Sequence, residues 1–196
     1  MVNEIIGLDW HFAFMPQGHE WTTHRKIFSR DFNSAVISKF NPSEIKWNRI
    51  FLRNLLTQPE AFLTHIQHLA SGLALDATHG YKSRNLANPI LLLEPRPKLL
   101  KALPLLGFTV KHIPSWIPSS PSRQAREWRV AVDIAKTVPF SVATAAKAGG
   151  QIGPSVLSDL LDSKQYQADD IRTTTAAMFA NGSAAVSSNV HDVRPA

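Results

Sequence analysis

The placement of prolines is the feature that most limits how this chain can fold. The sequence has 13 prolines, and seven of them fall within residues 85–121, a stretch that is also apolar. Proline lacks a backbone N–H and disfavours helix at the preceding residue, so this stretch can hold only short helices joined by extended turns. It is typical of a lid over an apolar substrate or of a shallow membrane contact, or else of a loop packed on the core.

Before that stretch, the apolar spacing predicts two helices. In residues 41–58, Asn41 can cap the helix, Pro42 takes its first turn, and Glu44 faces the free N–H groups there. The second helix opens at Pro59 and ends at Gly80. Apolar side chains recur at helical spacing on the face that each helix turns to the core: Trp47, Phe51 and Leu55, then Phe62, Ile66, Leu69 and Leu73.

After that stretch, three more helices are predicted. A long helix starts near residues 120–121 and ends where Pro139 interrupts its hydrogen bonds. A short apolar helix follows Pro154, and a last one covers residues 169–188, with acidic residues in its first turn, where the helix dipole favours them. The chain is therefore predicted to be mainly α.

Composition narrows the class of protein. Of 196 residues, 44% are hydrophobic and 18% are charged, which is typical of a globular chain with one core or two small ones. No apolar run reaches the length of a bilayer, and the N-terminus lacks the order of a signal peptide, so neither an anchor nor an export signal is expected. The absence of cysteine excludes disulfides, zinc–thiolate sites and a cysteine nucleophile.

The net charge of +6 raises the question of a polyanionic partner. Arg123, Arg126 and Arg129 would form one basic stripe on a helix, but no aromatic side chains alternate with them to stack on bases. A solvated helix face is favoured, and nucleic-acid binding is not expected.

Motifs for nucleotide binding, serine hydrolysis and zinc proteolysis are missing from the sequence. His65 and His68 could share a helix face, but without a third ligand nearby they are interpreted as surface histidines rather than metal ligands. Chemistry would therefore have to come from a cofactor or from sequence outside this chain.

Trp21 and Arg25 form the sharpest candidate site. Positions four residues apart project from one face of a helix, so the indole N–H and the guanidinium could converge on one anionic acceptor. Phe14 and Phe28 nearby suggest that a large apolar body carries this anion. The alternative is that Trp21 packs in the core while Arg25 is solvated.

The order of motifs resembles fungal cytochrome P450 haem-thiolate monooxygenases. "GLDWHFAFMPQGHEWTTHRKIFSRDF" resembles the stretch leading into their C helix, where a W-x-x-x-R pair binds a haem propionate, so the resemblance gives this role to Trp21 and Arg25. His79, Gly80 and Tyr81 correspond to a "Y-G-y" sequence at the end of a family helix. "HIPSWIPSSPSRQAREWR" resembles the segment that precedes the family's G helix, and "GGQIGPSVLSDLLD" resembles the motif that follows this helix. The resemblance runs from Gly7 to about Ala185 and implies a partial P450 fold, C to I helices.

The resemblance also shows two departures. The I-helix motif A-G-x-[DE]-T-[TS] would fall on Gly182, Ser183, Ala184 and Ala185. The glycine is kept, but the acidic and hydroxyl residues that deliver protons are either replaced by Ala184 and Ala185 or displaced by a gap, so no complete catalytic set is expected. The E-x-x-R helix and the cysteine loop that ligates iron are also absent. The chain is interpreted as an internal fragment that is inactive alone. Residues 1–188 are assigned to a partial P450 domain, and residues 189–196 are interpreted as a tail from non-native read-through.

For the whole family, the resemblance implies hydroxylation of a small apolar substrate with O2, often in secondary metabolism. It implies haem (iron protoporphyrin IX) as cofactor, NADPH through cytochrome P450 reductase as electron source, and the endoplasmic reticulum membrane as location. For this chain, it adds peripheral membrane contact through residues 85–121. Two other classes stay open: a helical scaffold or interaction protein without haem, and a basic lipid-surface binder.

Overall fold

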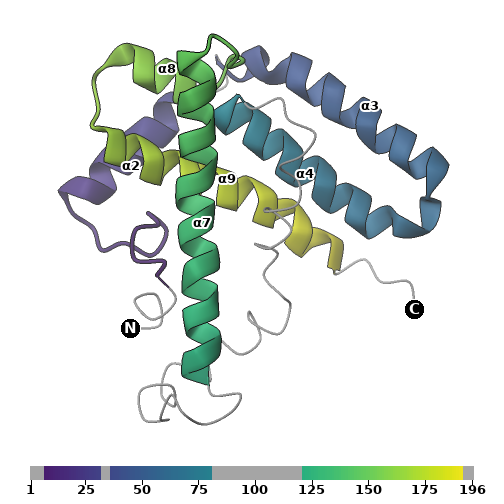
Figure 1. The fold of residues 1–196 in the computed structure, drawn as a ribbon, viewed down its shortest axis with the longest axis horizontal. Coiled ribbons are helices and arrows are strands. Elements are labelled where there is room, and N and C mark those ends of the chain that lie inside the picture. The colour runs from purple at the N-terminus through teal and green to yellow at the C-terminus, as the bar shows by residue number, and fades with distance from the viewer. Residues whose placement is uncertain (1–6, 32–35, 81–120, 192–196) are drawn as a thin grey trace.

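The computed structural model describes residues 7–31, 36–80 and 121–191, with the side chains of 121–128 and 184–191 excepted (Figure 1). Within these ranges the secondary structure is helical, without a strand. The mainly α class and the partial helical P450 fold are confirmed. The elements are α2 (His19–Asp31), η1 (Ile37–Phe40), α3 (Asn41–Thr57), η2 (Pro59–Ala61), α4 (Phe62–His79), α7 (Pro121–Ala148), α8 (Val156–Ser163) and α9 (Ala168–His191).

Helix α9 lies at the centre of the described helices. It packs against α4, α7, α2 and α8, while α3 packs on the far side of α4 (Figure 1). Gly182 of α9 lies so close to α4 that a Cβ there would be 3.0 Å from the Cβ of Ala74. Gly182 thus lets α9 and α4 approach closely. None of the described helices is both long and apolar enough to cross a membrane.

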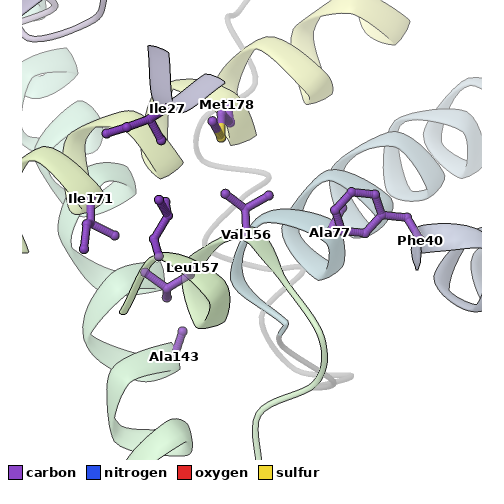
Figure 2. Packing of buried hydrophobic residues seen from close by; sticks show 9 residues of the cluster. Ile27, Phe40, Ala77, Ala143, Val156, Leu157, Ile171 and Met178 are labelled. Carbon is purple, nitrogen blue, oxygen red and sulfur yellow. The ribbon is translucent and has the colours of Figure 1, made fainter. Parts of the chain in front are cut away.

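Short helix α8 supplies the middle of the core. Figure 2 shows Val156 and Leu157 of α8 surrounded by buried side chains from α2, α4, α7 and α9. The Ser155 hydroxyl caps α8 by accepting the Ser158 N–H at 3.2 Å. Full burial of one large apolar side chain stabilises a fold by about 1.5–3 kcal/mol. The buried cluster therefore stabilises the contacts among α2, α4, α7, α8 and α9. Its members are Ile27, Phe40, Ala77, Ala143, Val156, Leu157, Leu160, Ile171 and Met178.

Gly80 ends α4, as predicted, in the left-handed conformation with φ of 66°. A Cβ at this position would lie 2.5 Å from the carbonyl oxygen of Gly153, whose own N–H donates to the carbonyl of Gly80 at 3.1 Å. Only glycine satisfies both the positive φ and this contact. The α4 end is thereby joined to the loop before α8.

Two predicted helix ends were wrong. Asn41 does not cap α3, because η1 runs directly into the helix and places Phe40 at the N-cap without a side-chain hydrogen bond. Pro139 does not end the long helix, since α7 continues from Pro121 to Ala148. A proline removes one backbone donor, and here the packing of α7 on α9 and α4 outweighs that loss.

Two predictions about α4 also need correction. Its predicted core face is only partly covered: Phe62 is exposed, and Ile66, Leu69 and Leu73 are half-buried. His65, interpreted as a surface histidine, is buried, with Nε2 2.8 Å from the Gln58 carbonyl oxygen. The reason is that α3 and η2 cover the His65 side of α4. Among the described residues, no cluster of potential metal ligands occurs.

The predictions for residues 81–120, including Tyr81 and a membrane contact through 85–121, lie outside the described residues. The 188/189 boundary falls inside α9, which continues to His191.

Candidate functional site

Helix α2 carries both members of the Trp–Arg pair on its outer side. Thr22 stabilises the first turn by donating its hydroxyl to the Gly18 carbonyl at 2.8 Å. His24, Ile27 and Asp31 recur at helical spacing and are buried, so they define the inner side. This packing fixes the direction in which Trp21 and Arg25 project.

Trp21 and Arg25 contact each other. The Arg25 Cζ lies 5.6 Å from the centroid of the Trp21 ring, within the range of a cation–π interaction. Trp21 is half-buried and Arg25 is exposed, so the structure has the solvated Arg25 of the alternative interpretation but not a fully buried Trp21. Among the described residues, Arg25 makes no ion pair. Its guanidinium is therefore free to receive an anion beside an indole.

His24 lies on the inner side of α2 and connects it to the start of α9. Its Nε2 is 3.9 Å from the Asp170 carboxylate, and its buried Nδ1 has no partner among the described residues. Burial lowers the pKa of His24, while Asp170, Glu20 and Asp169 oppose that shift. At neutral pH the ring is accordingly uncharged and acts as a packing group between α2 and α9.

His11 makes a second connection, from the segment before α2. It is buried, its Nδ1 accepts the Ala13 N–H at 3.2 Å, and its neighbours in α9 are Asn181 and the Ala177 backbone. Burial lowers the pKa of His11 as well. Phe12 extends the connection to α2, because its ring centroid lies 5.6 Å from that of Phe28.

Helix α2 packs on α9, with His24 beside Asp170 at the start of that helix. Of the I-helix residues, Gly182 lies against Ala74 of α4, and Ser183 donates to the Ala180 carbonyl at 3.0 Å. Ala184 and Ala185 are helical, but their side chains lie outside what the structure describes.

The motif around His79 and Gly80 has a structural explanation in the fold. His79 is fully buried, its Nδ1 is 2.7 Å from the Thr78 hydroxyl, and its ring meets Phe179 edge-on. Burial lowers the pKa of His79 to about 3. Sequence reasoning did not find the burial of His11, His24 and His79; the aromatic run around His11 was the one available signal.

The helical arrangement is the one expected of part of a haem-thiolate monooxygenase. Comparison with curated proteins confirms this resemblance: fungal cytochrome P450 monooxygenases match over most of the chain. No family model matches, and no solved structure does.

Three relatives illustrate the match. Cytochrome P450 monooxygenase COX1 of Coprinopsis cinerea is 29% identical, over 92% of this chain and 37% of its own length. Tryptamine 4-monooxygenase of Psilocybe cyanescens is 26% identical, over 93% of this chain and 39% of its own. Multifunctional cytochrome P450 monooxygenase af510 of Aspergillus fumigatus is 24% identical, over 89% of this chain and 37% of its own. The chain thus spans about 35% of the length of the curated relatives it matches.

Proposed function

We propose that this chain is the helical part of a cytochrome P450 monooxygenase that binds one haem propionate through Trp21 and Arg25. The observation that carries the proposal is the position of Arg25: exposed, stacked on Trp21, and without an ion pair among the described residues. A planar guanidinium suits a carboxylate, and the indole adds a donor and an apolar face for the porphyrin edge.

The residues of this chain contribute binding and orientation. Arg25 neutralises the propionate, Trp21 donates its indole N–H and shields the contact from water, and α2 holds both in register through its packing on α9. When bound, haem supplies the activation of O2. The chain has no cysteine, so it cannot itself donate a thiolate to iron.

The whole protein's activity is proposed as hydroxylation of a small apolar organic substrate, with electrons from NADPH delivered by a reductase. Location at the endoplasmic reticulum membrane belongs to the same proposal. Support comes from the three relatives described above, each of which is named as a monooxygenase.

Titration of the chain with ferric haem, followed by Soret absorbance and tryptophan fluorescence, tests the proposal. Arg25→Ala should weaken haem binding about tenfold, the loss expected for one charge-assisted hydrogen-bonded pair. Lys26→Ala removes an exposed cation from the next position of α2 and should leave binding unchanged. Equal affinities in the two variants would contradict the assignment.

A further inference from the structure

Helix α3 presents an exposed apolar ridge to solvent. Ile45, Leu52 and Leu56 are 53%, 57% and 87% exposed, and they repeat at seven- and four-residue spacing. At about 100° per residue, these three positions fall within about 40° of one another around the helix axis. We call Ile45, Leu52 and Leu56 the α3 ridge.

The opposite side of α3 is the one that holds it to the molecule. Trp47 is buried there, and its Nε1 donates to the Asp76 carboxylate of α4 at 3.1 Å. Trp47 also covers Gly72, where a Cβ would lie 2.3 Å from the ring. Since Trp47 lies about 200° from Ile45 around the axis, the ridge points away from α4, and α3 forms an outer edge of the molecule (Figure 1).

The ridge is bordered by positive charge. Arg49 lies about 40° and Arg53 about 80° from Ile45, both exposed and both without an ion pair among the described residues. Glu44 lies about 100° away on the other flank, and exposed Glu60 lies at the turn between α3 and α4. Next to that turn, Phe62 and Leu63 of α4 are each 45% exposed.

These charges decide what kind of partner fits. A second copy paired through the ridge would bring the two sets of arginines together near the middle of the contact, which like-charge repulsion disfavours. A convex ridge one helix wide, with leucines at its crest and arginines beside them, suits insertion at the boundary between lipid headgroups and acyl chains.

We propose that the α3 ridge binds an anionic lipid surface. Leu52 and Leu56 enter the interfacial layer, and Arg49 and Arg53 contact the headgroup phosphates. This inference does not depend on haem binding, because α3 and the Trp–Arg pair are carried by different helices.

Cosedimentation of the 196-residue chain with vesicles tests the proposal. The chain should bind vesicles of phosphatidylcholine with phosphatidylserine and bind pure phosphatidylcholine far more weakly. Leu52→Gln/Leu56→Gln should abolish most binding. Val130→Gln/Ile134→Gln is the matched control, since these α7 residues have the same spacing and are 58% and 37% exposed. Leu56→Gln alone gives a second measurement of vesicle binding, because Leu56 is the most exposed ridge residue and its substitution affects folding least.

A second set of variants tests the electrostatic contribution to vesicle binding. Arg49→Gln/Arg53→Gln should weaken binding roughly fivefold for each charge and reduce its dependence on salt. Lys26→Gln/Arg129→Gln removes the same charge from exposed positions on α2 and α7 and should have little effect. The proposal would be overturned if either control lost as much vesicle binding as the ridge variants, or if the ridge variants bound vesicles as well as wild type. Dimerisation that depends on the ridge, without vesicle binding, would also overturn it.

Discussion

The indole N–H of Trp47 donates to the buried carboxylate of Asp76 at 3.1 Å, across the contact between α3 and α4. Lys46 reaches the same Asp76 oxygen at 2.9 Å from a more exposed position. This one carboxylate therefore satisfies a buried donor and joins the two helices.

Asp76→Ala should lower the free energy of unfolding by about 2 kcal/mol, because it leaves the Trp47 N–H buried without an acceptor. Urea unfolding monitored by circular dichroism measures this change. Asp133→Ala removes an exposed carboxylate from α7 and should stay within about 0.5 kcal/mol of wild type. A neutral Asp76→Ala would show that water replaces the carboxylate.

Gly72→Ala should also destabilise the α3–α4 contact. The new Cβ would lie 2.3 Å from the Trp47 ring, so the ring or the helix must move, at a cost of about 1–3 kcal/mol. Gly149→Ala is the control, because its Cβ would meet neighbours only at 3.7 Å. If the two variants unfold at the same urea concentration, α4 is not held this closely to Trp47.

Stability should fall as the pH drops below about 6.5. Burial lowers the pKa of His11, His24 and His68, and that of His79 to about 3. The unfolded chain therefore binds more protons than the folded one below the ordinary histidine pKa, and stability is lost from there downward.

Urea unfolding at pH 7, 6 and 5 measures that loss. His79→Asn should flatten the dependence on pH, because it removes the most strongly shifted group. His19→Asn, which changes an exposed histidine of α2, should keep the wild-type slope. Identical slopes for all three proteins would show that His79 is protonated without unfolding.

Reduced haem bound to this chain should give no thiolate-type carbon monoxide spectrum. That spectrum requires sulfur to donate to iron, and the sequence has no cysteine. A Soret band of the thiolate type from the 196-residue chain would contradict its interpretation as part of a longer monooxygenase.

Hydrophobic spacing and proline placement were enough to predict most of the helices. The end of α4 at Gly80 followed from the chemistry of a left-handed cap, and α8 followed from an apolar run after Pro154. The passage of α7 through Pro139 could not be predicted in this way, because tertiary packing compensates for the lost hydrogen bond.

The burial of polar residues is the main feature that could not be predicted from the sequence. Asp76 and His79 carry no hydrophobic signal, and each meets a residue distant in sequence: Trp47, 29 residues from Asp76, and Phe179 of α9, whose ring packs on His79. For the candidate site, spacing alone suggested that Trp21 and Arg25 share a helix face. Only the structure could show that His24 and His11 hold that helix against α9.

The most direct test of the central claim compares ferric haem with its dimethyl ester, in which both propionates are uncharged. Wild-type chain should bind free-acid haem about tenfold more tightly than the ester, and Arg25→Ala should lose that preference while Lys26→Ala keeps it. If Arg25→Ala discriminates between the two ligands as well as wild type does, Arg25 does not bind a propionate.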